Sequence, residues 1–122
     1  MRLRPDPSFY PSPRMAMAAE KEKLAYVAAF DAAAALGRPG PHRHDALATI
    51  DLEPQSSSYG KIISLSEVPT FGDEMHHSGW NACSASLCPY APHPHVERRY
   101  LLLPCLRSSR IFVFDVLQDE LL

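Results

Sequence analysis

The sequence lacks the features that would assign it quickly to a common functional class. Its 122 residues carry 12 basic and 14 acidic side chains, so the formal charge of −2 provides no basic surface for nucleic acid or anionic lipid. It has no run of about 18 apolar residues, which would be needed for a transmembrane helix. Its proline-rich start has no apolar core typical of a signal peptide. We therefore expect no nucleic-acid partner and no transmembrane segment.

Cysteine is also scarce. Cys83, Cys88 and Cys105 form an odd set without a disulfide pattern. Because free thiols without a secretion signal are typical of reducing compartments, we expect a cytoplasmic protein. Glycine-rich phosphate loops, nucleophile elbows and paired-carboxylate motifs are absent too. The candidate reactive or metal-binding side chains are therefore the histidines and these three cysteines.

Proline, in contrast, is abundant, with 12 residues in the chain. Its usual share is about 5%, and it is excluded from helix interiors and central strands, so many loops and short strands are expected. Residues 1–20 are predicted to be a flexible N-terminal tail, although residues 15–23 contain helix formers that could make about two turns. Residues 21–122 are predicted to form the folded domain.

Short apolar segments separated by turn residues predict strands along most of the domain. Residues 46–53, ALATIDLE, alternate apolar and polar side chains as a half-buried strand does. The alanines at 32–35 could form one helical turn before a loop rich in glycine and proline. The complete set of predicted strands is 23–30, 46–53, 61–68, 99–106 and 110–117. Such a series indicates an all-β meander.

Two pairs of these strands resemble each other. LAYVAAF…ALATIDLE and RYLLLPCL…RIFVFDVL each join an apolar strand to one that ends in an aspartate between apolar residues. A repeated two-strand unit is typical of β-propeller blades, and chance similarity of two hairpins is the alternative. A blade takes about 40–50 residues and a closed ring needs at least about four blades. The chain is therefore expected to be a fragment, a partial β-propeller of about two blades.

The segment DEMHHSGWNAC, residues 73–83, concentrates the groups that could form a site. Adjacent side chains on an extended strand point to opposite sides, so His76 and His77 can share a metal ion only from a turn. Imidazole suits copper and zinc. Asp73 and Glu74 could each orient a ligating imidazole, or they could be solvated turn residues. Histidines that only pack or face solvent are the alternative to a ligand pair.

The rest of this segment has structural interpretations. Ser78 and Gly79 are predicted to form a turn. Trp80 is predicted to lie in the core, with a wall for a small apolar ligand as the alternative. Asn81 is expected to cap the turn by bonding backbone amides.

The thiols leave several possibilities open. Cys83 and Cys88, with four residues between them, could form a metal site with His93 and His95, although the spacing is not that of a zinc knuckle. Cys83 is also the best candidate for a reactive thiolate, because a nearby protonated histidine would lower its pKa. Cys105 lies in an apolar strand and is predicted to be a buried small hydrophobe.

Taken together, these residues resemble a known family. DALATIDLEPQSSSYGKIISLSEVPTFGDEMHHSGWNACS and ERRYLLLPCLRSSRIFVFDV look like the N-terminal part of the selenium-binding proteins, also known as methanethiol oxidases, and ERRYL is closer to plant members. The resemblance covers about residues 10–116. It implies a seven-bladed β-propeller in a complete chain, of which residues 21–122 would form about two blades.

The resemblance also implies an activity and its residues. The implied reaction oxidises methanethiol with oxygen to formaldehyde, hydrogen sulfide and hydrogen peroxide, with copper as cofactor and selenium bound through cysteine. His76 and His77 become the candidate catalytic residues and copper ligands, and Cys83 and Cys88 the candidates for binding selenium or a small thiol substrate. Their spacing departs from the family's C-x-x-C. We expect the fragment alone to be inactive; the alternatives are a selenium or heavy-metal scavenger without catalysis and a propeller interaction module.

Overall fold

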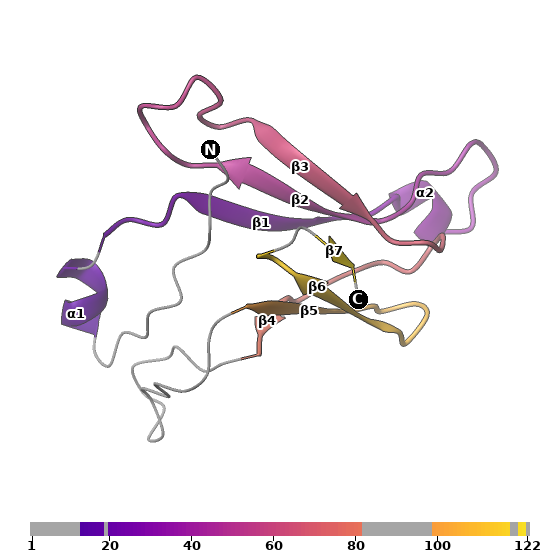
Figure 1. Cartoon of the computed structure of the whole chain (residues 1–122). Coiled ribbons are helices and arrows are strands. Elements are labelled where there is room, and N and C mark those ends of the chain that lie inside the picture. Colours follow the sequence, from indigo (N-terminus) through magenta and orange to yellow (C-terminus); the bar gives the residue numbers. More distant parts are fainter. Residues whose placement is uncertain (1–12, 19, 82–98, 118–119, 122) are drawn as a thin grey trace.

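The computed structural model describes residues 13–18, 20–81, 99–117 and 120–121. Two antiparallel sheets lie one over the other (Figure 1). The first sheet has the order β1 (Leu24–Ala29), β2 (Ala46–Asp51), β3 (Ile62–Glu67). The second sheet has the order β4 (Gly79–Trp80), β5 (Tyr100–Pro104), β6 (Ile111–Asp115), β7 (Glu120–Leu121). The described helices are α1 (Pro13–Ala18) and α2 (Ala32–Ala35).

These elements confirm the all-β prediction and all five predicted strands to within two residues at either end. The helix near the N-terminus starts earlier and is shorter than the interpretation of residues 15–23, and the predicted tail lies largely outside the described residues. Two short strands were not predicted. Gly79, taken as part of a turn, starts β4, and β7 follows the last predicted strand. In the part of the chain described, no helix is long and apolar enough to cross a membrane.

Strand β2 is the centre of the first sheet and is more buried than its sequence indicates. Its leucine, Leu47, belongs to the core between the sheets, and Ala48 is covered on the opposite face, where it pairs with Val27 and Leu65. Thr49 is also buried, although the alternating pattern predicted one solvated face. The prediction of a half-buried strand was therefore wrong. β1 and β3 flank β2 on both sides and cover its side chains, and an alternating pattern in one strand does not reveal its neighbours.

The main core lies between the two sheets. It is formed by Leu47, Val68, Met75, Leu101, Leu103, Cys105, Phe114 and Val116. Trp80 packs against this core and meets Tyr26 of the first sheet edge-on, with ring centroids 5.7 Å apart. This edge-to-face contact joins β1 to β4, so the interpretation of Trp80 as a core residue is confirmed.

The two hairpins that resemble each other in sequence also share their register. In β1 and β2, Leu24 pairs with Asp51, and in β5 and β6, Tyr100 pairs with Asp115. Each aspartate accepts a hydrogen bond from the backbone N–H two residues later, at 2.8 Å for Asp51 and 3.2 Å for Asp115. The repeat is therefore a repeat of structure as well as of sequence.

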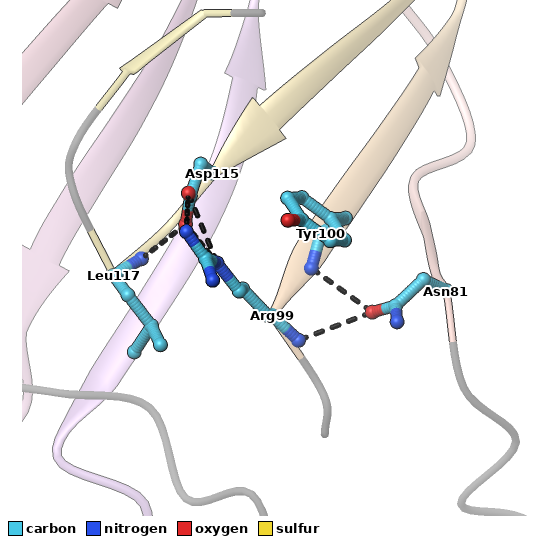
Figure 2. A network of polar contacts seen from close by, with 5 residues as sticks. All are labelled: Asn81, Arg99, Tyr100, Asp115 and Leu117. Carbon is cyan, nitrogen blue, oxygen red and sulfur yellow. Dashed lines mark hydrogen bonds and ion pairs between the residues drawn. The ribbon is translucent and has the colours of Figure 1, made fainter. Parts of the chain in front are cut away.

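Figure 2 shows how the second hairpin closes around its aspartate. The Arg99 guanidinium donates from Nε to both carboxylate oxygens of buried Asp115 at 2.9 Å, and Leu117 N–H donates to the same carboxylate. Asn81 Oδ1 accepts from the backbone N–H groups of Arg99 and Tyr100 at 3.1 and 2.9 Å. Asn81 thus bonds backbone amides as expected, but those at the start of β5 rather than in its own turn.

Candidate functional site

The histidine turn, residues 73–77, runs beside the end of β5. The His76 N–H donates to Pro104 O at 2.9 Å, and Leu106 N–H donates to Glu74 O at 3.0 Å. Between these two bonds, Met75 forms an isolated bridge with Cys105 and points into the core. The turn is therefore held by the second sheet through its backbone.

Two buried carboxylates hold the histidine turn from the interior of the protein. Asp45, at the start of β2, accepts from Met75 N–H at 3.1 Å and from Asp31 N–H at 3.1 Å. Asp73 accepts from the Thr70 hydroxyl and, at 2.6 Å, from the Arg110 guanidinium. Burial acts to raise the pKa of Asp73, but hydrogen bonds from Thr70, Ser108 and Arg110 outweigh it and hold that pKa below its ordinary value. Asp73 is therefore not a solvated turn residue, which was one of the two interpretations of its place in the sequence.

The backbone of the turn is strained at two positions. Glu74 and His77 have φ angles of 58° and 53°, in the left-handed region that residues other than glycine rarely adopt. Such conformations persist only where the surroundings enforce them, and here the bonds to β5 and to Asp45 do so. The left-handed residues interrupt the alternation of an extended strand. As a result, the rings of His76 and His77 lie on the same side, with centroids 5.5 Å apart and planes tilted by 30°.

His76 is the better oriented of the two histidines. Its Nε2 lies 3.3 Å from Glu74 Oε1, and Glu74 Oε2 accepts from Arg107 Nε at 3.1 Å. The Phe30 ring, at the end of β1, lies 5.1 Å from the imidazole. Glu74 is thus the carboxylate that orients an imidazole, whereas the Asp73 carboxylate bonds the side chains of Thr70 and Arg110. His77 is exposed, and no hydrogen-bond partner is found for its ring among the described residues.

The spacing of the two imidazoles can be compared with that of a ligand pair. A metal–nitrogen bond of about 2.0–2.1 Å places each ring centroid about 3.2 Å from the metal, so two tetrahedral ligands have centroids about 5 Å apart. The observed 5.5 Å is close to this value. Within the described residues, however, no group of three or more histidine, cysteine or acidic side chains could hold a metal ion. The pair could supply two ligands, and a complete site would need others.

The candidate thiols divide into two groups. Cys83 and Cys88, together with His93 and His95, lie outside the described residues. Cys105 is buried in the core, and burial raises the pKa of its thiol. The prediction that Cys105 is a buried small hydrophobe is confirmed.

An open pocket of about 490 Å³ adjoins the turn and was not predicted. It shares Phe30 with the surroundings of His76, and its lining includes Asp31, Arg43, His44 and Leu65. The Asp31 carboxylate caps α2 and also accepts from Arg43 N–H at 2.8 Å, which ties the loop before β2 to the start of α2. The only sequence signal for this pocket is HRH at residues 42–44, in the loop rich in glycine and proline, where histidines are expected to be solvated.

His44 departs from that interpretation. Its ring stacks on Phe71 with centroids 3.9 Å apart, and its Nδ1 lies 3.0 Å from Thr70 O. Thr70 in turn bonds Asp73, so the pocket and the histidine turn share one polar chain. Arg107, Phe30 and Asp45 were also missed, because each comes from a segment distant in sequence from residues 73–77.

Comparisons with known proteins find one family model and several similar proteins. The family model of the 56 kDa selenium-binding proteins (SBP56) matches residues 3–121. Selenium-binding protein 3 of Arabidopsis thaliana is 44% identical over 110 residues, which cover 87% of this chain and 20% of that protein. A methanethiol oxidase of Xenopus laevis is 41% identical over 90% of this chain and 21% of that protein. The chain therefore spans about a fifth of the length of these relatives.

A solved structure is similar as well. The X-ray structure of a hypothetical selenium-binding protein from Sulfolobus tokodaii matches with a TM-score of 0.75 and 50% sequence identity. The match covers 90% of this chain and 23% of that one. Both the sequence and the arrangement of the two sheets are thus shared with a longer protein.

Proposed function

The chain belongs to the SBP56 family of selenium-binding proteins, and we propose that it is part of a copper-dependent methanethiol oxidase in which His76 and His77 are copper ligands. The relatives named methanethiol oxidase support the activity. The paired imidazoles of the histidine turn are the observation that carries the assignment of the site. A cytoplasmic location belongs to the same proposal.

The proposed architecture is a seven-bladed β-propeller, of which residues 21–122 form about two blades. Support comes from the two stacked antiparallel sheets and from the equal register of their hairpins. In radial repeats of this kind, each sheet packs on the next through apolar faces. The histidine turn joins the first sheet to the second, at the junction of the two proposed blades.

The proposed reaction converts methanethiol, oxygen and water to formaldehyde, hydrogen sulfide and hydrogen peroxide, one molecule of each. The carbon loses two electrons, and oxygen gains them with two protons. Bound copper would coordinate the soft thiol sulfur and make it easier to oxidise. Glu74 would hold His76 through Nε2 and leave Nδ1 as its ligating atom. Asp45 and Asp73 would keep the turn in place.

Residues 1–122 alone are expected to show no turnover. His77 is exposed and His76 is half-buried, whereas catalysis needs a preorganised site from which water is excluded. Hydrogen peroxide is measured after methanethiol and copper are added to the purified chain. Steady production above that of free copper would refute this expectation.

Copper binding tests the ligands without relying on turnover. The 122-residue chain is titrated with Cu(II) and followed by electron paramagnetic resonance, which reports nitrogen ligands. His76→Ala/His77→Ala should lose the tightest site, and Glu74→Gln should weaken it about tenfold. His42→Ala, at an exposed histidine in the loop before β2, is the control and should leave the site unchanged. An unchanged signal in the first double variant would remove His76 and His77 from the site.

Selenium binding is a second candidate function, favoured by the relatives named selenium-binding protein. We propose that Cys83 and Cys88 take up the selenium, because Cys105 is buried. The bound selenium per chain is measured after incubation with selenite and glutathione. Cys83→Ser/Cys88→Ser should lower it and Cys105→Ser should not. Equal selenium in all three proteins would exclude this pair.

A further inference from the structure

The face of the first sheet that points away from the second sheet is apolar and open. We call it the outer face of the first sheet. Val27 and Leu65 lie on it, on either side of Ala48, with exposed fractions of 45% and 53%. Ile62, opposite Ile50, adds a side chain that is 61% exposed. Adjoining apolar residues exposed on one face mark an interaction surface more often than scattered ones do.

The second sheet also has an apolar outer face. Leu101, Leu103, Phe112 and Phe114 point into the core, so the alternate residues of β5 and β6 point away from it. These alternate residues are Tyr100, Leu102 and Pro104 on β5 and Ile111 and Val113 on β6, with Asp115 at the end of the face, where Arg99 covers it. Ile111 is 63% exposed. The described chain is therefore a stack of two sheets with an open apolar face at each end.

The register shared by the two hairpins shows which face of one sheet corresponds to which face of the other. Aligning the pair Leu24 and Asp51 with the pair Tyr100 and Asp115 places Tyr26 at the position of Leu102. Tyr26 packs against the core, whereas Leu102 lies on the outer face of the second sheet. The inner face of the first sheet thus corresponds to the outer face of the second.

The converse correspondence also holds. The same alignment places Val27 at the position of Leu103, which is fully buried in the core. The outer face of the first sheet thus corresponds to the inner face of the second. The contact already present inside the molecule pairs these same two kinds of face, so it can be repeated at either end.

We propose that the 122-residue chain associates with a second copy of itself head to tail, the outer face of the first sheet of one copy packing on the outer face of the second sheet of the other. In a longer chain with the proposed propeller, the neighbouring blades would cover these two faces. For residues 1–122 by themselves the occupant is chosen by continuity with the contact between the sheets, which a second copy reproduces. The contact is heterologous, because different surfaces meet. This association requires neither copper nor a thiol, so its test is independent of the proposed activity.

The size of the faces sets the strength of the association. Three strands about 4.8 Å apart and about 20 Å long give a face of about 300 Å² in plane. Stable complexes bury about 800 Å² on each side, so a weak interaction is expected, seen at about 100 µM and above. Sedimentation velocity and light scattering over about 10–500 µM should show the average mass rising with concentration.

Two single variants test the head-to-tail arrangement. Leu65→Lys places a charge on one outer face and Ile111→Lys on the other, and both positions are exposed enough to leave the fold intact. Each variant alone keeps one unmodified outer face, but the face that it would pack on carries a lysine in every other copy. Each should therefore be monomeric. Mixed in equal amounts, they should form a heterodimer and nothing larger, because each supplies the face that the other lacks.

The matched control is Leu36→Lys, at a residue that is 55% exposed and follows α2, outside both sheets. It should associate as the unmodified chain does. Circular dichroism confirms that all variants retain their sheets. The proposal is overturned if the unmodified chain stays monomeric at about 500 µM. It is overturned equally if only one lysine variant loses association, if their mixture stays monomeric, or if the control is monomeric too.

Discussion

Replacing Asp73 by asparagine should destabilise the fold and the histidine turn together. The side chain is fully buried and keeps nearly the same shape after this change, so packing is conserved while the charge is lost. The Thr70 hydroxyl then loses a charged acceptor, and the Arg110 guanidinium loses its ion-pair partner. The backbone bond from Arg107 N–H to the Asp73 carbonyl, at 3.2 Å, gives no compensation because it exists already.

The magnitude follows from these contacts. A hydrogen bond to a charged group contributes about 1.5–3 kcal/mol to stability. Because the Arg110 side chain is 52% exposed, its ion pair is screened by solvent and counts for only about 0.5–1 kcal/mol. The sum is about 3 kcal/mol. With an m-value of about 1.5 kcal/mol per molar urea, the midpoint of urea unfolding should fall by about 2 M.

The dependence on pH gives this prediction a second test. The folded pKa of Asp73 is lower than its ordinary value of 3.8, so its stabilisation is complete above the unfolded pKa and is lost as the pH falls through the folded pKa. The difference in unfolding free energy between the two proteins should be constant at neutral pH and shrink below about pH 4. Glu67→Gln, at an exposed carboxylate, is the control and should leave the midpoint unchanged. An Asp73→Asn midpoint within about 0.3 M of the unmodified protein would refute the role of this carboxylate.

Three further outcomes are expected. Phe114→Ala should lower the free energy of unfolding by about 3–5 kcal/mol because it opens a cavity between the sheets, whereas Phe71→Ala, at an exposed ring, should cost far less; equal losses would contradict the core assignment. Arg99→Leu should cost about 3 kcal/mol by leaving the Asp115 carboxylate buried without its ion pair, and Arg99→Leu/Asp115→Asn should regain part of that loss in the same urea assay. Cys105 should resist iodoacetamide at pH 8 in the native protein, since burial raises the pKa of its thiol, and it should react in urea; peptide mass spectrometry that found it labelled in the native state would contradict its burial.

The predictable part of the fold was carried by apolar runs and turn residues. Residues 99–106 and 110–117 became β5 and β6 with small changes at their ends, because a run of apolar residues bounded by proline, serine and charge has few other solutions. The short strands β4 and β7 have two residues each and hold their place by pairing with β5 and β6 rather than by their own pattern. Their formation depends on long-range pairing, which the local sequence does not display.

The sequence predicted which residues belong to the candidate site, but it did not predict how their side chains are arranged. DEMHHSGWNAC indicates imidazoles beside carboxylates, but it does not say which carboxylate serves which purpose. That division is made by Pro104, Arg107 and Arg110, about 30 residues further on: Arg110 draws Asp73 inward, and Arg107 holds Glu74 beside His76.

The orientation of the two rings depends on the same distant contacts. The bond from His76 N–H to Pro104 O anchors the middle of the turn, and left-handed conformations at Glu74 and His77 follow on both sides of it. Left-handed conformations are uncommon for residues other than glycine, so the contacts with β5 are needed to hold both residues in them. The imidazole pair is therefore a product of the contact between the turn and the second sheet. Any perturbation that loosens this contact should separate the two rings before it unfolds the first sheet.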